Sequence, residues 1–456
     1  MRTDWDLIVI GGGTAGLAAA RQARRGGHGV LLVQDGEVGG DCTFTGCIPS
    51  KTLIAAAAQG LSSAHAFGRV RATVAQVAAA ETADVLRSEG IAVLEGRGRL
   101  LGRGGVQVGG ARLQAARIVL ATGSRPVTPA VPGLAGSAYL TNETVFALAA
   151  APSSLAVVGG GPVGCELAQA LARLGTTVTL VEAGPQLLPK EEPEAAEVVA
   201  TALRDDGVDV RLRAPLREVT PLDGSGRLRL RLGDGSVVEA DRVLLATGRA
   251  AAMDGLGLDA AGVTLDEAGW VRTDRRLATS ARGVWAAGDL TGRLPFTHAA
   301  DAMGRTAARN ATARVGWLPY STRAVPWVTF TTPEVGRVGL TEEQAARHGG
   351  RVAYLPMAEL DRAVTAGETR GYLKLIAGPR LVTRGALGGR VLGATVVCSR
   401  GGELVHEAAL AMRAGMFTGR LAQTTHAYPS WSMAVQLAAG QLFQEVGGRR
   451  ARPAVA

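Results

Sequence analysis

Two cysteines close together in the chain are the residues whose type and spacing best suit chemistry. Cys42 and Cys47 lie in the segment GGDCTFTGCIPSK, which runs from Gly39 to Lys51. Five residues of an ideal helix rise about 7.5 Å, more than the usual Cα spacing of a disulfide, so a bridge between these cysteines requires a distorted turn. Gly46 supplies the freedom for that turn, and a strained bridge is readily reduced. If a helix begins here, its N-terminus lowers the pKa of a thiol and favours thiolate exchange.

A zinc site or two unrelated buried thiols are the alternatives for this pair. Zinc would require a second pair of ligands, and the remaining cysteines, Cys165 and Cys398, are isolated in the sequence. Four cysteines in 456 residues do not make the disulfide framework of a small secreted domain. The pattern therefore favours redox chemistry at a dithiol, and no resident metal is expected.

The rest of the composition narrows the class of protein. The formal net charge is +9, yet no block of five or six like charges occurs, so neither a nucleic-acid ligand nor a membrane surface is expected. No uninterrupted apolar run reaches the roughly 18 residues that span a bilayer, and nothing resembles a signal peptide, so we expect a cytoplasmic protein. The only lysines are Lys51, Lys190 and Lys374 among 49 lysines and arginines, which makes each a candidate for a required role.

An internal repeat supplies the elements that must position this chemistry. Residues 8–35 align without gaps on residues 156–183, and each copy predicts a strand, a glycine turn, an amphipathic helix and a second strand. Both copies match G-x-G-x-x-G, with Gly11, Gly13 and Gly16 in the first and Gly159, Gly161 and Gly164 in the second. Such a turn lets a pyrophosphate approach the N-terminus of the helix. Two bound dinucleotides are therefore expected.

The residue at the end of the second strand of each repeat discriminates between nucleotides. In the second repeat it is Glu182, which can accept hydrogen bonds from the ribose hydroxyls and would repel the 2′-phosphate of NADP. No arginine follows in AGPQLLP to hold such a phosphate, so NADH is favoured over NADPH. In the first repeat the equivalent residue is Gln34, with Asp35 beside it, and either side chain can bond the ribose.

Further strand patterns complete the predicted organisation. The segments RIVLATGSRP (117–126) and RVLLATGRAA (242–251) echo one another, and GVWAAGDLTG (283–292) belongs with the first domain because the second already has its own strand. The predicted fold class is α/β, with two Rossmann-like dinucleotide-binding domains and a C-terminal α+β domain. The expected bounds are 1–150 and 271–335 for the first domain, 151–270 for the second and 336–456 for the third. The final segment, GGRRARPAVA, is expected to fray.

These motifs together resemble the flavoprotein disulfide reductase family, which includes dihydrolipoyl dehydrogenase, glutathione reductase and mercuric reductase, over essentially the whole chain. The resemblance implies that the first repeat binds FAD, the second binds NAD(P)H, and the C-terminal domain forms a homodimer. It implies a redox-active Cys42–Cys47 disulfide, with Cys47 as the thiolate against the flavin and Cys42 as the interchange thiol. Lys51 would lie near the flavin and pair with Glu166. The implied cofactor-binding positions are Gly11, Gly13, Gly16, Gln34, Asp35, Gly40, Lys51, Gly98, Thr122, Gly123, Asp289 and Thr297, together with Gly159, Gly161, Gly164, Glu182 and Gly248.

The C-terminal signature departs from that family. The usual pattern is H-x-H-P-T-x-x-E, whereas this chain has THAYPSWSM, so Tyr428 replaces the acid/base His and Met433 replaces the Glu. A tyrosine with an ordinary pKa of about 10 is a poor base near neutrality. His426 is retained, and we hypothesise that it takes over part of the acid/base role; a structural histidine is the alternative. Tyr428 is either catalytic or an interface aromatic.

This departure bears on the electron acceptor. Mercuric reductases also lack that His, and a soft metal ion needs thiolate ligands but no protonation of a leaving thiol. Their C-terminal cysteine pair is absent here, so the expected acceptor is a metal ion or a small disulfide. Dihydrolipoyl dehydrogenase activity on lipoamide is one alternative. Another is a 2-ketopropyl-coenzyme M oxidoreductase/carboxylase, although those enzymes carry a His where this chain has Met433. A structural subunit of a larger complex is the non-enzymatic alternative.

Overall fold

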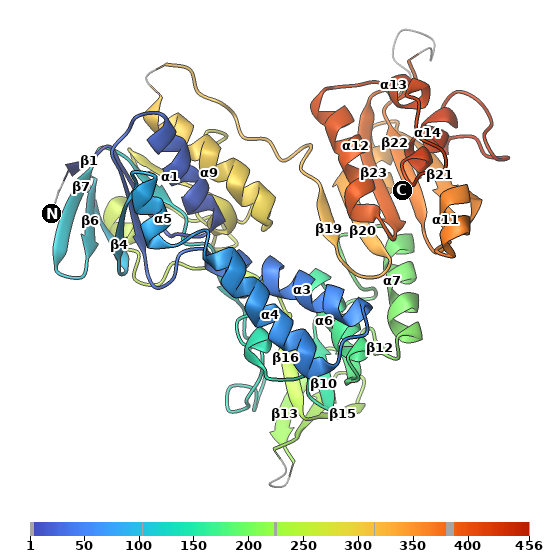
Figure 1. The fold of residues 1–456 in the computed structure, drawn as a ribbon, viewed down its shortest axis with the longest axis horizontal. Coiled ribbons are helices and arrows are strands. Elements are labelled where there is room, and N and C mark those ends of the chain that lie inside the picture. Colours follow the sequence, from blue (N-terminus) through green and yellow to red (C-terminus); the bar gives the residue numbers. More distant parts are fainter. Residues whose placement is uncertain (1–3, 103, 223–225, 314, 380–386, 456) are drawn as a thin grey trace. The chain divides into compact units, whose positions relative to one another are not determined.

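The structure is a computed structural model that describes residues 4–102, 104–222, 226–313, 315–379 and 387–455. The chain groups into two compact units; Figure 1 colours the chain by its position in the sequence. The first unit comprises Met1–Pro129, Leu140–Ala151 and Thr247–Thr322, and the second comprises Ala130–Tyr139, Pro152–Ala246 and Arg323–Ala456. This division into two units does not test the bounds predicted for the three domains, which stay predictions.

A five-stranded parallel sheet forms the centre of the first unit. Its order is β18 (Val284–Ala286), β8 (Ile118–Leu120), β2 (Leu7–Ile10), β3 (Val30–Gln34) and β4 (Ala92–Glu95). The expectation that the strand of GVWAAGDLTG joins the first sheet is confirmed by the pairing of β18 with β8. Helices α1 (Thr14–Arg25) and α9 (Thr297–Thr312) lie side by side (Figure 1). A Cβ atom on Gly304 of α9 would lie 2.1 Å from the Ala15 carbonyl oxygen of α1, so their close packing requires glycine.

Smaller elements complete the first unit. A four-stranded sheet has the order β1 (Asp4–Trp5), β7 (Ala111–Ala115), β6 (Gly105–Val108) and β5 (Gly98–Gly102). The strands after the two Ala-Thr-Gly motifs, β9 (Ser124–Pro126) and β17 (Arg249–Ala251), pair with each other in antiparallel fashion. The remaining helices are α2 (Gly40–Phe44), α3 (Cys47–Ala58), α4 (Ser63–Ala78), α5 (Ala83–Ser88), η1 (Val145–Ala147), α8 (Leu258–Ala261) and η2 (Gly288–Thr291).

The second repeat forms one part of the second unit. A parallel sheet has the order β12 (Asp209–Arg211), β11 (Thr177–Val181), β10 (Ser154–Val158) and β16 (Arg242–Leu245), with α6 (Pro162–Arg173) and α7 (Pro193–Asp205). An antiparallel sheet of β13 (Leu216–Pro221), β14 (Leu228–Leu232) and β15 (Val237–Ala240) follows. Strand β14 alternates buried leucines with exposed arginines, which is the pattern of a sheet with one face in solvent.

The C-terminal part is α+β, as expected. Its six-stranded sheet has the order β19 (Trp327–Thr329), β20 (Glu334–Gly339), β23 (Val391–Cys398), β22 (Tyr372–Ala377), β21 (Arg351–Pro356) and β24 (Arg452–Pro453). Its helices are α10 (Glu342–Ala346), η3 (Met357–Glu359), α11 (Asp361–Ala366), α12 (Gly401–Arg413), α13 (Thr418–Gln423) and α14 (Met433–Gly440). The α/β fold class is therefore confirmed. In the described part of the chain, no helix combines the length and apolarity needed to cross a membrane.

The expectation of a frayed C-terminal tail is wrong. Strand β24 pairs with β21, with Val352 opposite Arg452. The Arg452 guanidinium also binds the Glu342 carboxylate, whose side chain is 7% exposed. The basic tail is ordered because it supplies both a strand for the edge of the sheet and a counter-charge for a buried acid.

Lys374 has a structural role in this sheet. Its side chain is 1% exposed, and its ammonium lies 2.8 Å from Glu194, 2.9 Å from Glu342 and 3.5 Å from Glu192. Burial alone lowers the pKa of Lys374, but the hydrogen bonds to Glu194 and Glu342 raise it overall. A compact ammonium with three donors can serve several carboxylates at once, which accounts for this rare lysine.

Candidate active site

The helix is interrupted between the two cysteines, as their spacing predicts. Cys42 lies in α2 and Cys47 is the first residue of α3, with Gly46 at the N-cap between them. A Cβ atom on Gly46 would lie 2.7 Å from the Asp41 carbonyl oxygen, so glycine permits the close approach that brings the cysteines together. Both cysteines are half-buried. Solvent can therefore reach both side chains, as exchange chemistry at a dithiol requires.

The two thiols differ in their surroundings. Cys47 Sγ lies 3.2 Å from Thr297 Oγ1 and stands in the first turn of α3, where the helix dipole favours a thiolate. The hydrogen bond to Cys47, with burial and the charge on Cys47, raises the pKa of Cys42. The two thiols therefore influence each other's protonation, and the roles of Cys47 as thiolate and Cys42 as interchange thiol stay predictions.

The first glycine turn has the shape that a pyrophosphate requires. A Cβ atom on Gly16 would lie 1.8 Å from the Gly11 carbonyl oxygen, and Gly11 has a φ of +105°. Helix α1 begins after Gly13 and no side chain caps it. A Cβ atom on Gly13 itself would meet only Gly40 Cα, at 3.8 Å. The open N-terminus of the helix thus fits an anionic cofactor such as FAD.

The side chain of Gln34 organises this turn. Its Oε1 accepts a hydrogen bond from the Gly12 N–H at 2.5 Å, and its amide donates to the carbonyls of Asp35 and Glu37, each at 3.0 Å. The Asp35 carboxylate binds Arg97 at 2.8 Å. Both candidates for the ribose in the first repeat are thus engaged with protein groups.

The other positions implied for FAD lie in the same unit. Thr122 Oγ1 donates to the Ala252 carbonyl at 2.7 Å, and a Cβ atom on Gly98 would meet Ile10 Cγ2 at 2.9 Å. A Cβ atom on Gly123 would meet nothing within 4 Å, which leaves room for a ligand there. The remaining implied positions are Gly40, which closes on Gly13, Lys51 in α3 one turn after Cys47, Thr297 at the start of α9 and Asp289 in η2.

A cavity begins beside the first glycine turn. It has a volume of about 740 Å³ and is lined by Gln34, Glu37, Phe44, Val70, Val74 and Phe146, among others. Its lining combines apolar side chains of α4 with polar groups, which suits a ligand with an aromatic ring. The cavity and the first glycine turn have Gln34 in common.

The second glycine turn repeats the geometry of the first. A Cβ atom on Gly164 would lie 1.9 Å from the Gly159 carbonyl oxygen, whereas one on Gly161 would meet nothing within 4 Å. Glu182 accepts hydrogen bonds from the N–H groups of Gly160 and Gly184, each at 2.6 Å. Gly248, the remaining implied position, belongs to the first unit, where its carbonyl accepts from the Val127 N–H.

Glu166 is held by a backbone group. It lies in α6 with 4% of its surface exposed, and its Oε1 accepts a hydrogen bond from the Phe330 N–H at 2.8 Å. The predicted ion pair between Lys51 and Glu166 stays a prediction. Because burying a polar group without a hydrogen-bond partner is costly, the bond from the Phe330 N–H offsets part of the cost of burying this side chain.

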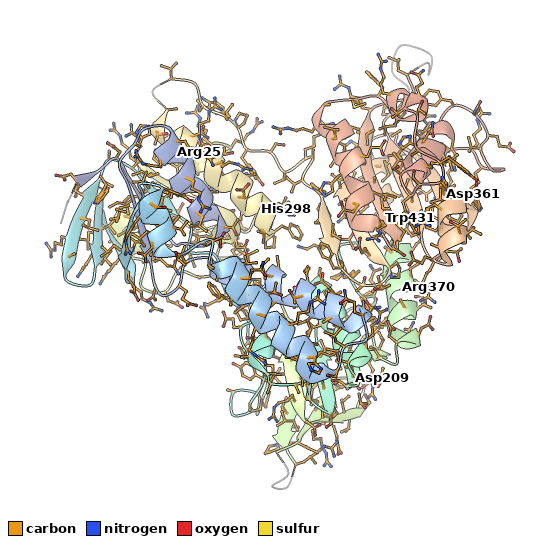
Figure 2. The ribbon with its side chains drawn as sticks, in the orientation of Figure 1. Arg25, Asp209, His298, Asp361, Arg370 and Trp431 are labelled. Atoms are coloured by element: carbon orange, nitrogen blue, oxygen red, sulfur yellow. The ribbon has the colours of Figure 1, made fainter. Side chains whose placement is uncertain are left out.

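The C-terminal segment holds His426 and Tyr428 in different ways. The His426 side chain is 6% exposed, with Nε2 at 3.1 Å from Glu407 and Nδ1 at 2.9 Å from the Thr424 carbonyl. Tyr428 is 69% exposed, and its hydroxyl donates to Asp361 at 2.9 Å. That hydrogen bond, followed by the charge on Asp361, raises the pKa of Tyr428. Asp361, which begins α11, is labelled in Figure 2.

Comparisons with known proteins agree with this geometry. The family model of the pyridine nucleotide-disulphide oxidoreductases matches residues 5–304, and the model of their dimerisation domain matches residues 325–439. The chain belongs to the pyridine nucleotide-disulphide oxidoreductase family. It is therefore an oxidoreductase of a family that depends on FAD and takes electrons from NAD(P)H.

Individual relatives cover almost the whole chain. The mercuric reductase of Streptomyces lividans is 36% identical over 97% of this chain and 97% of its own length. The dihydrolipoyl dehydrogenase of Chlorobaculum tepidum is 34% identical over 98% of this chain and 99% of its own length. The Cu(II) complex of the HOCl-induced flavoprotein disulfide reductase RclA from Escherichia coli superimposes with a TM-score of 0.86 at 30% identity, over 96% of this chain and 99% of that one.

Two charged residues near the predicted site residues of this oxidoreductase were not predicted from the sequence. Glu407 comes from α12, and nothing in the sequence links it to His426. Arg249 binds Asp41, the residue before Cys42. The echo of the Ala-Thr-Gly motifs held a signal for Arg249, because Ser124 and Arg249 occupy equivalent places after the two glycines and hydrogen-bond to each other.

Proposed function

We propose that this oxidoreductase uses NADH to maintain Cys42 and Cys47 as a dithiol that reduces a soft metal ion or a small disulfide. FAD, when bound, supplies the two-electron chemistry that links the nucleotide to the sulfur atoms. Closing the Cys42–Cys47 disulfide releases two electrons and two protons, and the acceptor takes up the electrons. The observation that carries the proposal is the half-buried pair of thiols on either side of Gly46, with Cys47 at the N-terminus of α3.

A metal ion is the acceptor that the C-terminal segment favours. Reduction of lipoamide or glutathione disulfide requires a group that protonates a leaving thiol near neutral pH. Tyr428 is poorly suited to this, because its hydroxyl is committed to Asp361 and its pKa is raised. A metal ion needs only thiolates. The names of the relatives, mercuric reductase and a reductase studied as a Cu(II) complex, point to the same class of acceptor.

For His426 we propose a structural role in place of the acid/base role. Both ring nitrogens of His426 already have protein partners, Nδ1 with the Thr424 carbonyl and Nε2 with the Glu407 carboxylate. A ring held at both nitrogens is suited to fixing the segment in place, which supports the structural role. His426→Gln should therefore leave turnover of a metal ion and of a disulfide acceptor within about twofold of native while lowering the melting temperature. A tenfold loss of kcat at an unchanged melting temperature would reinstate the acid/base role.

The nucleotide, the oligomer and the location are further parts of the proposal. Glu182 supports NADH, because a carboxylate disfavours the 2′-phosphate of NADPH. The matched dimerisation domain supports a homodimer. A cytoplasmic location is the prediction made from the sequence.

The decisive experiment is steady-state oxidation of NADH and NADPH with Hg(II), Cu(II), lipoamide, glutathione disulfide and a quinone as acceptors. We expect NADH with a metal ion to be the fastest combination, and we expect Cys42→Ser and Cys47→Ser each to abolish it. Anaerobic NADH should also produce a long-wavelength absorption band that Cys47→Ser lacks. Cys398→Ala is the matched control, because Cys398 is buried in β23.

The other outcomes are equally informative. Fast turnover of lipoamide would replace the proposal with dihydrolipoyl dehydrogenase activity. Full turnover of the metal ion by Cys42→Ser and Cys47→Ser would show that the dithiol is bypassed, and it would falsify the proposed function.

A further inference from the structure

A single guanidinium is connected to the segment that carries the two cysteines. Arg249 Nη2 donates to the carboxylate of Asp41, the residue before Cys42, and Nη1 lies 3.3 Å from Asn142 Oδ1. Asn142 in turn donates to the Thr45 carbonyl at 3.2 Å. Arg249 is therefore connected to both ends of the segment 41–45, directly at Asp41 and through Asn142 at Thr45. All these residues lie in the first unit.

The same guanidinium is anchored on its other side. Its Nε donates to Ser124 Oγ at 2.7 Å, and Nη2 also donates to the Ser124 carbonyl at 2.8 Å. Ser124 Oγ donates to Asp289 Oδ2 at 2.8 Å, and Arg249 Nε lies 4.0 Å from the same oxygen. Arg249 thus stands between two carboxylates, those of Asp41 and Asp289. Its side chain is 26% exposed.

We propose that Asp41 and Arg249 form a clamp that positions the Cys42–Cys47 segment relative to Asp289 and thereby sets how readily the two thiols form their disulfide. Asp41 and Arg249 are positioning residues, since they act through the cysteines and not on the acceptor. The proposal rests on the proposed redox function of Cys42 and Cys47.

The segment needs an external support. Helix α2 has five residues and ends before Gly46, and a helix this short has little stability of its own. A hydrogen bond of 3.3 Å between Thr45 Oγ1 and Asp41 Oδ1 ties the segment internally. Movement of Asp41 therefore moves Cys42 directly, whereas Cys47 is fixed at the start of the longer helix α3.

Arginine is the residue type that this position requires. Each of its three nitrogens contacts a different group in a planar arrangement, which the single ammonium of lysine cannot reproduce. Its charge also offsets two carboxylates: burial raises the pKa of Asp289, the charge of Arg249 lowers it, and the charge of Asp41 raises it. Removing Arg249 would leave the carboxylates of Asp41 and Asp289 without this positive charge between them.

The test measures the dithiol directly, without relying on turnover. The full-length protein is equilibrated in redox buffers of reduced and oxidised dithiothreitol, and free Cys42 and Cys47 are alkylated and quantified by mass spectrometry. We expect Asp41→Asn to change the dithiol–disulfide equilibrium constant about tenfold, which is about 30 mV for two electrons. The rate of Cys42 alkylation should rise as the segment loosens, and that of Cys47 should change less.

A double-mutant cycle assigns the effect to the pair. Asp41→Asn, Arg249→Gln and the double variant are compared, and we expect the double variant to resemble Arg249→Gln alone, since the two residues act together. Arg249→Lys should not restore the native equilibrium constant. Arg21→Gln is the matched control, because Arg21 binds Glu89 at 2.8 Å in the same unit with similar exposure.

The outcomes separate the clamp from the proposed function. If native Cys42 and Cys47 form no disulfide in any buffer, the proposed redox function fails. If they form one and Asp41→Asn leaves both the equilibrium constant and the alkylation rates at native values, the clamp alone is refuted. Additive effects in the cycle would refute it as well. If Arg249→Gln fails to fold, the smaller substitution Asp41→Asn still tests whether the clamp affects the dithiol–disulfide equilibrium.

Discussion

The first and second glycine turns share one geometry but end on different side chains. In each, the N–H of the middle glycine donates to the side chain at the end of the following strand: Gly12 to Gln34 at 2.5 Å and Gly160 to Glu182 at 2.6 Å. In each, the helix begins without a capping side chain. The residue at the strand end therefore shapes the turn as well as facing the nucleotide.

The difference lies in charge and in the remaining partners. Glu182 is an acidic residue and accepts a second hydrogen bond from the Gly184 N–H. Gln34 is neutral and donates to two carbonyls that follow it. Equal backbone geometry with different side chains indicates that the turn is set by glycines and hydrogen bonds, and selection of the nucleotide by the side chain at the strand end is a prediction.

The largest expected effect breaks one turn and spares the other. In Gly164→Ala the new Cβ would lie 1.9 Å from the Gly159 carbonyl oxygen, so the turn must open at a cost of about 3 kcal/mol. We expect this variant to retain FAD and to lose reduction by NADH. Gly16→Ala, with a corresponding distance of 1.8 Å, should instead be isolated without FAD. Urea unfolding and the ratio of flavin absorbance to protein measure both, and loss of FAD from Gly164→Ala would contradict the assignment of the two turns.

An intermediate effect separates a glycine needed by the fold from one needed by the ligand. A Cβ atom on Gly161 would meet no protein atom within 4 Å, and its φ of −73° suits any residue. The midpoint of urea unfolding of Gly161→Ala should therefore equal that of the native protein. The KM for NADH should rise about tenfold, equivalent to about 1.4 kcal/mol, because the second glycine of the motif lets the backbone approach the pyrophosphate. An unchanged KM would mean that the nucleotide does not approach this turn.

Features encoded over short stretches of sequence were the ones that could be predicted. Both glycine turns and the helix break at Gly46 follow from residues within about one turn of each other, where periodicity and glycine positions are informative. The strand of GVWAAGDLTG was placed in the first domain because the second domain already had a strand of its own. The α/β class followed from these elements together.

Contacts between distant residues could not be predicted. Arg249 and Asp41 are 208 residues apart, and Lys374 and Glu194 are 180 apart; a charged residue in a sequence carries no mark of its partner. The tail was taken for a frayed end because polar, glycine-rich termini usually are. Its order depends on the free edge of β21 and on the acid Glu342, which are features of the folded C-terminal part.

The smallest expected effect makes the second turn resemble the first. Glu182→Gln keeps a carbonyl oxygen that can accept from the Gly160 N–H, so the turn should keep its shape. It removes the negative charge that opposes the 2′-phosphate, an interaction of about 1 kcal/mol between unit charges at 4 Å in water. The ratio of kcat/KM for NADH over NADPH should therefore fall about fivefold, measured with the same metal acceptor for both nucleotides. Glu182→Ala is the informative contrast, since it removes the charge and the acceptor together and should weaken both nucleotides. If Glu182→Gln lowers kcat/KM for NADH and NADPH equally, Glu182 shapes the turn without selecting the nucleotide.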